Sequence, residues 1–379
     1  MGRRRKRRVA VVTGTRAEYG LLTSTMEAIR DSRRLELRLV ATGMHLLRRF
    51  GATVRQIRAD GWSVDAVVRM QRGDDTRLDQ AQGLASGIRG IAGFLVETDA
   101  DIVLVLGDRI EALAGALAGT TTGRLVAHVH GGDVAAGDFD DATRHAITKL
   151  SHVHLAATHD AARRIHRLGE SRDRIHVVGA PGLDRLRAIA EGEHVTSDPS
   201  AALIVHHARG RKAVHEARVM RAILGAVTRR GLHATVVYPN TDRGHSGIVG
   251  AIQQARRDHR RSDLRVVRNL PRDAYLRQLI KSRVLIGNSS SGIIEAATAG
   301  TAVVNIGPRQ KGRLRAGRCI VEADETAASI NRALDRALRM RPRIGAKTAY
   351  GCGQAGSAIA RVLETVDLSD AFRCKLICY

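Results

Sequence analysis

The segment 128–145 holds the densest group of side chains suited to proton transfer. Its acidic and basic members are Asp133, Asp140, Asp141, Arg144 and His145. Carboxylates beside arginine and histidine suit general acid and base work on a weakly acidic C–H. Helix capping would account for one of these acids, but not for three near a double-glycine turn. The two histidines and the aspartate at 128–133 lack the ligand order of a zinc site, so we expect no metal.

Two polar turns follow expected strands in the first half of the chain. After the first strand, Gly14 permits a tight turn, the next helix offers free N–H groups to an anion, and Arg16 adds a charge-assisted donor. The turn is not Gly-x-Gly-x-x-Gly, so an NAD site is not supported. After the fourth strand, Asp108 and Arg109 stand where parallel sheets carry catalytic groups. The alternative for Asp108 is a structural cap on the following helix.

The second half carries a serine-rich turn, Gly-Asn-Ser-Ser-Ser-Gly at 287–292, between an expected strand and a helix. The hydroxyls of Ser289 and Ser290 and the free N–H groups there suit a diphosphate. Glu295 lies one turn further and could accept hydrogen bonds from ribose hydroxyls. A plain serine N-cap is the alternative. Other strand ends in this half also carry polar side chains, at His207, Asn240 and Arg309.

Short runs of Val, Ile and Leu alternate with helix-length segments along the chain, which predicts parallel sheets covered by helices on both faces. In the first half we expect strands at 9–13, 35–42, 64–68, 102–106, 125–130, 154–157 and 175–178. In the second half we expect them at 202–206, 235–238, 264–267, 284–286 and 302–306. The predicted fold class is α/β, with two doubly wound Rossmann-like domains that bind a ligand in a shared cleft.

A polar stretch at 191–200 is the best candidate linker between these domains. The expected organisation is a basic, disordered extension over 1–8, an N-terminal domain over 9–190, a C-terminal domain over 191–366 that includes a final helix, and a tail over 367–379.

The charge balance is strongly basic. The chain has 379 residues, with 62 Lys and Arg against 38 Asp and Glu, a net charge of +24. Most arginines are scattered over expected helix faces, without aromatic residues interleaved for base stacking, so we expect no specific nucleic-acid partner. A basic nucleic-acid-binding module is the alternative from another functional class. No apolar run reaches membrane-spanning length, no secretory signal opens the chain, and four irregularly spaced cysteines favour a reducing cytoplasm.

Eight segments resemble the UDP-N-acetylglucosamine 2-epimerase family, especially its hydrolysing branch, and span about residues 9–366. They are Thr13–Leu22, Gly107–Glu111, His128–Asp133, Asp140–Ser151, Gly179–Asp184, Tyr238–Asp242, Gly287–Glu295 and Arg309–Arg313. The run Arg-His-Ala-Ile-Thr-Lys after an aspartate pair is typical of the hydrolysing and related branches. Gly-Asn-Ser-Ser is shared with the non-hydrolysing epimerases.

The resemblance implies a glycosyltransferase-B-like fold that holds UDP mainly in the C-terminal domain and turns the amino sugar toward the N-terminal one. It implies nucleotide contacts from Arg16, Arg109, Asn240, Ser289, Ser290, Glu295 and Arg309. It implies acidic and basic positions around the sugar at Asp108, Asp133, Asp140, Asp141, Arg144 and His145, with His207 on the leaving-group side. The implied enzyme is a cytoplasmic homo-oligomer, a dimer or tetramer, that needs no cofactor and no metal.

The implied reaction turns UDP-N-acetylglucosamine, or a close UDP-2-acetamido sugar, and water into N-acetylmannosamine, or its analogue, and UDP. Three positions depart from the family pattern: Asp133 where glutamate is usual, Ala208 where proline follows the histidine, and Arg268-Asn269 where a basic residue and histidine are usual. They bear on the identity of the sugar more than on the nucleotide. The alternatives are a non-hydrolysing epimerase that yields UDP-N-acetylmannosamine, and a glycosyltransferase-B-type UDP-sugar transferase.

Overall fold

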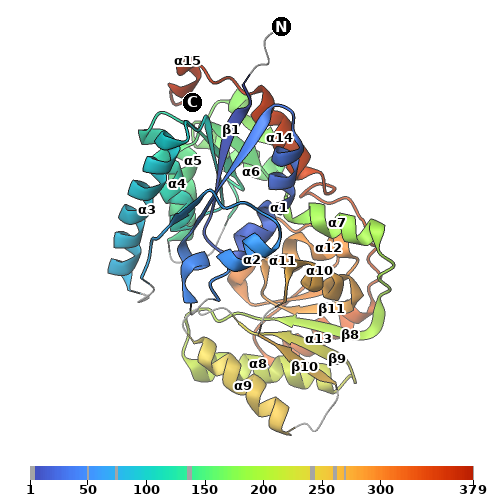
Figure 1. The fold of residues 1–379 in the computed structure, drawn as a ribbon. Helices are drawn as coiled ribbons and strands as arrows, with labels where there is room; N and C mark the ends of the chain where they lie inside the picture. The colour runs from blue at the N-terminus through green and yellow to red at the C-terminus, as the bar shows by residue number, and fades with distance from the viewer. Residues whose placement is uncertain are drawn as a thin grey trace. The chain divides into compact units, whose positions relative to one another are not determined.

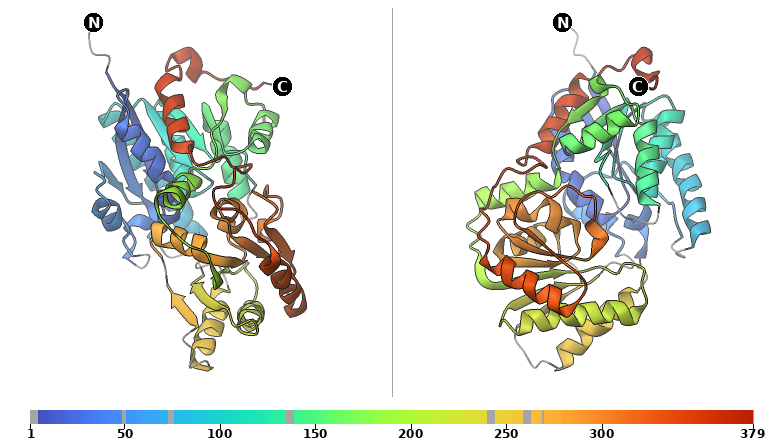
Figure 2. Two further views of the ribbon diagram at one scale, coloured as in Figure 1. Left: turned by 90° about the vertical axis from the view of Figure 1, so that its right-hand side faces the viewer. Right: turned by 180° about the vertical axis from the view of Figure 1, so that it is seen from behind.

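The computed structural model describes residues 5–48, 51–72, 76–134, 139–239, 244–258, 263–268 and 270–378 (Figure 1). The chain forms two compact units: unit 1 is Met1–Asp184 with Gln354–Tyr379, and unit 2 is Arg185–Gly353. Each unit holds one parallel sheet covered by helices (Figures 1 and 2). The predicted α/β class with two doubly wound Rossmann-like sheets is therefore confirmed.

The described sheet of unit 1 runs in the order β3-β2-β1-β4-β5-β6-β7. Its strands are β1 (Arg7–Thr13), β2 (Leu35–Thr42), β3 (Ala66–Val68), β4 (Ile102–Leu106), β5 (Leu125–Val129), β6 (Val153–Ala156) and β7 (Ile175–Val177). Successive side chains of a strand point to opposite faces, so Val9 and Val11 pack in one core cluster and Ala10 and Val12 in another. Burial on both faces explains why these strands are apolar without alternation.

Helices cover both faces of this sheet (Figure 2). The core with Val9 contains apolar residues of α1 (Arg16–Asp31) and α14 (Ala355–Thr365), and the core with Ala10 contains those of α3 (Arg77–Glu97) and α4 (Ile110–Thr121). The other helical segments that the structure describes in this unit are η1 (Gly43–Leu46), α2 (Val54–Ala59), α5 (Asp140–Leu150), α6 (His159–Arg167), η3 (Arg172–Arg174) and α15 (Asp370–Arg373).

The described sheet of unit 2 runs in the order β10-β9-β8-β11-β12-β13. Its strands are β8 (Asp198–Val205), β9 (His233–Val237), β10 (Leu264–Val267), β11 (Ser282–Gly287), β12 (Ala302–Ile306) and β13 (Ile320–Ala323). The helical segments described in this unit are α8 (Ala213–Thr228), α9 (His245–Asp258), α10 (Arg272–Lys281), α11 (Ser290–Ile294), α12 (Ala296–Ala299), η4 (Pro308–Gln310) and α13 (Ala327–Arg339). α7 (Gly182–Gly192) begins in unit 1 and ends in unit 2.

The final helix differs from the expected domain division. The sequence places residues 355–366 in the domain over 191–366, whereas α14 belongs to unit 1. Its apolar stripe, with Ile359 and Leu363, joins the core of β1 and α1. Arg7 donates to the carbonyls of Leu363 and Val366 at the end of α14, at 3.0 and 2.6 Å. Burial of that stripe, and not sequence order, therefore decides which unit takes the helix.

The expected disordered extension over 1–8 is also too long. Arg7 and Arg8 already belong to β1, which pairs along its length with β2. The backbone N–H of Arg8 donates to Asp101 at 2.8 Å, and Arg5 forms an ion pair with Asp101 at 2.7 Å. Arg5 and Arg8 are thus held by acidic partners at the amino-terminal end of β1. Residues 1–4 lie outside the described residues.

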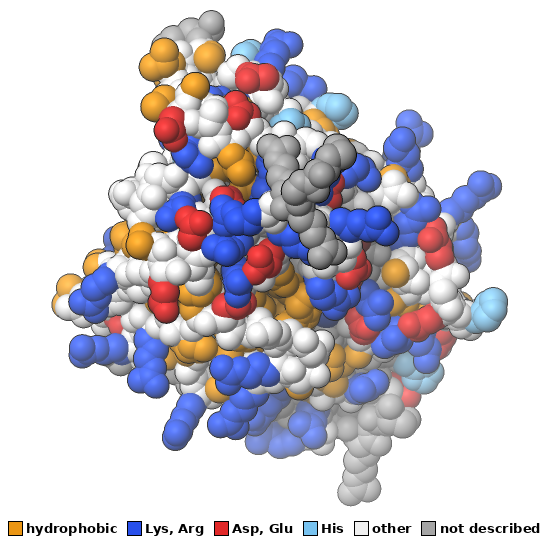
Figure 3. Space-filling model, turned by 45° about the horizontal axis from the view of Figure 1, so that its top comes forward, with side chains coloured by type: hydrophobic (Ala, Val, Ile, Leu, Met, Phe, Trp, Pro, Cys, Tyr) orange, Lys and Arg blue, Asp and Glu red, His pale blue; other side chains and the backbone are white. Residues whose placement is uncertain are grey.

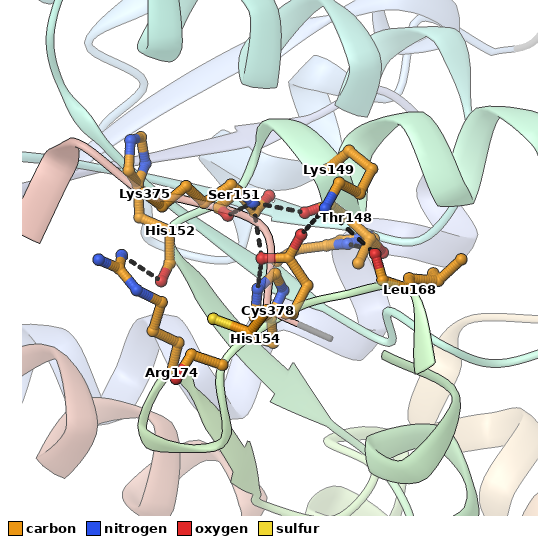
Figure 4. Close-up of polar contacts among 12 residues, drawn as sticks. Thr148, Lys149, Ser151, His152, His154, Leu168, Arg174, Lys375 and Cys378 are labelled. Atoms are coloured by element: carbon orange, nitrogen blue, oxygen red, sulfur yellow. Dashed lines mark hydrogen bonds and ion pairs between the residues drawn. The ribbon is translucent and has the colours of Figure 1, made fainter. Parts of the chain in front are cut away.

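The described part of the tail, residues 367–378, packs against the rest of unit 1 through a buried ion cluster (Figure 4). Glu170 accepts hydrogen bonds from Lys149, His154 and Lys375 at 2.6, 3.0 and 2.7 Å, with its side chain 2% exposed. The backbone N–H of Cys378 donates to the carbonyl of Gly169 at 2.8 Å. The tail therefore packs against the domain. No motif in its sequence predicts this packing.

Charged side chains are dispersed on the face drawn in Figure 3, where acidic groups stand among the basic ones. Many arginines pair with nearby acids, such as Arg230 with Asp335 at 2.7 Å and Arg277 with Glu193 at 2.6 Å. Within the described residues, none of the helices is both long and apolar enough to cross a bilayer.

Candidate functional site

The ends of β1, β4 and β5 lie side by side at one edge of the unit 1 sheet. β1 and β4 are neighbours although β2 and β3 separate them in the chain, which makes this edge a topological switch point. Arg16 follows β1, Asp108 and Arg109 follow β4, and Asp133 follows β5. The fold therefore brings these four candidates to one edge, where ligands bind in open parallel sheets.

Arg144 connects three elements at this edge. The side chain comes from α5 and is nearly buried, and its guanidinium forms an ion pair with the carboxylate of Asp108. The same guanidinium donates to the backbone carbonyl of His130 at 2.6 Å. His130 has φ +63°, a left-handed conformation that is uncommon outside glycine and recurs at functional sites. Asp108 is thereby held in one orientation while its side chain stays 20% exposed.

Two acid–histidine pairs accompany this ion pair. Nδ1 of His130 lies 2.8 Å from the carboxylate of Asp133, and both side chains are buried. Nε2 of His145 lies 3.3 Å from the carboxylate of Asp141, one helical turn away, as the sequence spacing predicts. Carboxylates that orient imidazoles in this way can hold and pass protons.

The capping alternatives for these acids do not hold. α5 begins after Phe139, which makes no side-chain cap, and Asp140 and Asp141 lie in its first turn. α4 begins after Arg109, again without a side-chain cap, so Asp108 is not the structural cap of that helix. Acids in a first helical turn still complement the helix dipole.

The turn after β1 corrects one expectation. Glu18 accepts hydrogen bonds from the backbone N–H groups of Gly14 and Thr15, at 2.7 and 3.3 Å, and the Thr15 hydroxyl accepts one from the N–H of Glu18 at 3.3 Å. This capping box occupies donors that the sequence reading offered to an anion. Burial, followed by the charge of Glu111, raises the pKa of Glu18 to about 8. Arg16, half-buried at the start of α1, keeps its assignment as a prediction.

Glu111 is a second buried acid that the candidate set omits. It accepts hydrogen bonds from Arg109 at 3.1 Å and from Gln71 at 3.0 Å. A Cβ atom on Gly14 would lie 2.4 Å from Cγ of Glu111, so only glycine fits there. Glu18 and Glu111 both lie inside family-like segments, Thr13–Leu22 and Gly107–Glu111. For Glu18 the sequence does hold a signal, because Thr-x-x-Glu is the spacing of a capping box.

In unit 2 the ends of β8, β11 and β12 lie side by side. Asn288 connects them: its side chain accepts from the backbone N–H of His207 at 2.8 Å and donates to the carbonyl of His207 at 2.9 Å. Its own carbonyl accepts from the side chains of Gln310 at 2.9 Å and Arg309 at 3.5 Å. The structure therefore brings His207, the serine turn and Arg309 together, with Asn288 as a connecting residue that sequence reasoning did not single out.

The serine turn is partly occupied by its own hydrogen bonds. Ser289 caps α11 by accepting from the N–H of Ser291 at 3.3 Å, and the two hydroxyl oxygens lie 3.0 Å apart. The N-cap alternative is thus realised at Ser289. Ser290 is half-buried in the first position of α11.

Glu295 lies between α11 and α12, with its side chain 5% exposed. Arg272, the first residue of α10, donates to both carboxylate oxygens, at 2.5 and 3.3 Å. Glu295 is thus fixed in place before any ligand binds, by a partner that the sequence analysis did not identify.

Burial sets the protonation of His206 and His207, the two histidines at the end of β8. Burial, followed by the charge of Arg309, lowers the pKa of His207 to about 3, and burial lowers that of His206 to about 4. Both imidazoles are therefore neutral at physiological pH. A neutral imidazole can accept a proton or a hydrogen bond, but it adds no positive charge for a departing phosphate.

Asn240 lies outside the described residues, so its assignment stays a prediction. Among the residues that the structure describes, no group of three or more His, Cys, Asp or Glu side chains could hold a metal ion.

Sequence comparison gives relatives over nearly the whole chain. The profile of the family described as UDP-N-acetylglucosamine 2-epimerase matches residues 27–364. A protein of Legionella pneumophila named UDP-N,N'-diacetylbacillosamine 2-epimerase (hydrolyzing) is 33% identical over 370 residues, which cover 96% of this chain and 97% of that protein. A UDP-N-acetylglucosamine 2-epimerase of Neisseria meningitidis is 29% identical over 375 residues, 95% of each chain.

Solved structures share the fold at low sequence identity. The Neisseria meningitidis UDP-GlcNAc 2-epimerase bound to UDP-GlcNAc has a TM-score of 0.76 at 16% identity, over 94% of this chain and 99% of that one. The Methanocaldococcus jannaschii UDP-GlcNAc 2-epimerase in complex with UDP-GlcNAc and UDP has a TM-score of 0.73 at 18% identity, over the same shares.

Proposed function

Because this chain belongs to the UDP-N-acetylglucosamine 2-epimerase family, we propose that it is a hydrolysing 2-epimerase of a UDP-2-acetamido sugar. The observation that carries this proposal is the Asp108–Arg144–His130 connection at the edge of unit 1, flanked by the two acid–histidine pairs. The name of the Legionella relative supports the hydrolysing reaction and adds the UDP-linked diacetamido sugar to UDP-GlcNAc as a substrate.

The reaction begins with removal of the proton on C2 of the sugar. The C–H electron pair becomes a C1=C2 double bond, the C1–O bond breaks with its electrons on oxygen, and UDP leaves. Water then adds its hydroxyl to C1, and a proton returns to C2 from the opposite face. The products are a free 2-acetamido hexose of inverted C2 configuration and UDP, so no external oxidant or reductant is required.

The proposed proton-transfer groups are Asp108, Asp133, Asp140 and Asp141. Asp108 is the best first base, because Arg144 fixes its orientation and its carboxylate remains accessible. Asp133 is buried against His130 and suits a supporting role.

The remaining candidates are proposed as binding residues. We assign Arg144 and His145 to the sugar, and Arg16 and Arg109 to the phosphates. To the nucleotide we assign Asn240, Ser289, Ser290, Glu295 and Arg309, and to the leaving group His207. Neutralising the departing diphosphate lowers the barrier to C1–O cleavage.

Product analysis in heavy water tests the proposal. The purified protein is incubated in D2O with UDP-GlcNAc, and separately with its diacetamido counterpart, and products are identified by NMR. We expect UDP and a free hexosamine that carries one deuterium at C2. An intact UDP-N-acetylmannosamine would indicate the non-hydrolysing reaction, and turnover only after an acceptor is added would indicate a transferase. Product without deuterium at C2 would refute the elimination.

Asp108→Asn tests the assignment of the base. We expect kcat to fall about 100-fold or more, the usual range for loss of a general base, while UDP affinity changes little. Asp31→Asn is the matched control, because Asp31 is an exposed acid at the end of α1 with its side chain 67% exposed. If Asp108→Asn keeps near wild-type turnover, another acid removes the proton.

A further inference from the structure

One face of α10 contacts the segment 289–295 at two places. Arg272 and Tyr275 lie three residues apart, so they share a side of the helix. Arg272 donates to both carboxylate oxygens of Glu295, and Tyr275 forms a hydrogen bond with the hydroxyl of Ser291. A single helix face therefore holds both the serine turn and the acid that follows it.

The Arg272–Glu295 pair is built to orient a carboxylate. The guanidinium has a planar fork of donors that matches the two oxygens of a carboxylate, and here it meets both, at 2.5 and 3.3 Å. The Glu295 side chain is 5% exposed and the Arg272 side chain 26% exposed, so solvent screens the pair only weakly. Without Arg272, a buried carboxylate would lose its only ion-pair partner among the described residues.

The ion pair with Arg272 leaves Glu295 able to accept further hydrogen bonds. A carboxylate has about four lone-pair positions, and Arg272 occupies one on each oxygen. One position on each oxygen remains, a spacing that suits the two adjacent hydroxyls of a ribose. Arg272 would then act on the ligand through Glu295 and not by direct contact.

Tyr275 fixes the serine turn in a similar way. Its hydroxyl meets Ser291, whose hydroxyl oxygen lies 3.0 Å from that of Ser289. Burial raises the pKa of Tyr275, so the phenol stays neutral and able to donate. The chain Tyr275–Ser291–Ser289 thus sets the orientation of the cap of α11.

We propose that Arg272 is a positioning residue of the nucleotide site, which holds Glu295 in the orientation that selects a ribose with both hydroxyls, and that Tyr275 supports the adjoining turn. This inference rests on the proposed function, because it assumes that Glu295 meets the ribose of UDP. It adds Arg272, a residue outside the eight family-like segments, and a specificity for ribonucleotides over 2'-deoxyribonucleotides.

Calorimetric titration of the full-length protein with UDP and with 2'-deoxy-UDP tests the inference. We expect wild type to prefer UDP by about 10-fold or more, the effect of one charged hydrogen bond. Arg272→Gln is expected to weaken UDP about 10-fold and 2'-deoxy-UDP less than about 3-fold, so that the preference collapses. Arg272→Lys, which keeps the charge but loses the fork, is expected to restore part of it.

Additivity gives a second readout. If Arg272 acts through Glu295, the double variant Arg272→Gln/Glu295→Gln binds UDP no more weakly than Glu295→Gln alone. Arg277→Gln is the matched control: Arg277 lies on the same helix and forms a bidentate pair with Glu193, but on the exposed surface. We expect it to leave both affinities unchanged.

The results that would contradict the role of Arg272 differ from those that would contradict the nucleotide site itself. Equal weakening of both ligands by Arg272→Gln, or additive losses in the double variant, would mean that Arg272 only stabilises the fold, and the inference would be wrong. Unchanged UDP affinity in Arg272→Gln would also overturn it. Failure of the wild-type protein to bind UDP, or unchanged UDP affinity in Glu295→Gln, would instead refute the proposed nucleotide site.

Discussion

The buried acid Glu18 shows how one side chain can serve structure at the edge of a site. One oxygen of its carboxyl group accepts hydrogen bonds from the N–H groups of Gly14 and Thr15 and so shapes the turn that carries Arg16. Charging it is costly, because it is buried and close to Glu111, and its pKa rises to about 8. The acid therefore keeps its proton near neutrality and holds the turn as a neutral group.

This shift predicts a pH-dependent stability. The pKa of Glu18 is raised on folding, so its contribution is complete below the ordinary value near 4.5 and is lost as pH rises through about 8. Glu18→Gln mimics the protonated acid, and we expect its melting temperature to match wild type near pH 5 and to exceed it above pH 8. Thermal unfolding of both proteins across this range measures the difference. A constant offset at all pH values would contradict the assignment.

Three acids near the proposed site form ion pairs with arginines in the absence of substrate. Asp108 is bound by Arg144, Glu111 by Arg109, and Glu295 by Arg272. Arg109 is the N-cap of α4, Arg272 is the first residue of α10, and Arg144 lies in the first half of α5. Fixed pairs of this kind reduce the reorganisation that a reaction would otherwise require.

At the scale of elements, α5 carries chemistry at one end and an anchor at the other. Asp140, Asp141 and Arg144 lie in its first half, and Lys149 near its last turn reaches Glu170. The tail adds Lys375, which also donates to the carbonyl of Ser151 at 2.7 Å, directly after α5 (Figure 4). The tail therefore holds the helix at the end opposite its proposed catalytic residues.

Removing this anchor should destabilise the protein. We expect Lys375→Met to cost about 1–3 kcal/mol at neutral pH, because buried Glu170 loses one of its donors. Its donors lower the pKa of Glu170 to about 2 despite its burial, so its contribution is present above about 4.5 and is lost as pH falls toward 2. Denaturant unfolding should show the deficit of Lys375→Met shrinking over that interval.

Lys347→Met is the matched control, since Lys347 is an exposed lysine of unit 2. Equal stability of the Lys375→Met variant and this control would mean that the tail contributes nothing to the anchor.

On the scale of the whole molecule, the chain passes between the two units twice, at 184–185 and at 353–354. Asp184 accepts from the N–H groups of Ala355 and Gly356, at 2.9 and 2.6 Å, which fastens the returning chain at the start of α14. Unit 2 is thus an insertion between two segments of unit 1, and its core cluster is built from its own residues.

This organisation predicts that residues 185–353 fold alone. A self-contained core and two neighbouring chain ends are what an independently folding domain requires. We expect a cooperative thermal transition by circular dichroism and measurable UDP binding, without turnover, because the proposed acids lie in unit 1. A broad, non-cooperative transition would show that unit 2 depends on unit 1 for its core.

Much of the fold, and part of the candidate site, could be predicted from the sequence alone. Strand and helix periodicity indicated both sheets, because burial on two faces imposes continuous apolar runs such as 102–106. Motif spacing indicated which strand ends carry polar groups, because the carboxyl ends of parallel strands meet at one edge. The i, i+4 relation of Asp141 and His145 followed from helix geometry and is observed.

Only the tertiary structure decided which charged side chains pair with one another. Arg144 with Asp108, Arg272 with Glu295, and Lys375 with Glu170 are separated by 36, 23 and 205 residues, and no local pattern encodes such distances. The same holds for α14, whose apolar stripe could cover either sheet but is buried in unit 1. Local preferences determine which elements form, whereas pairing of buried charges and of apolar faces depends on which elements the completed fold brings together.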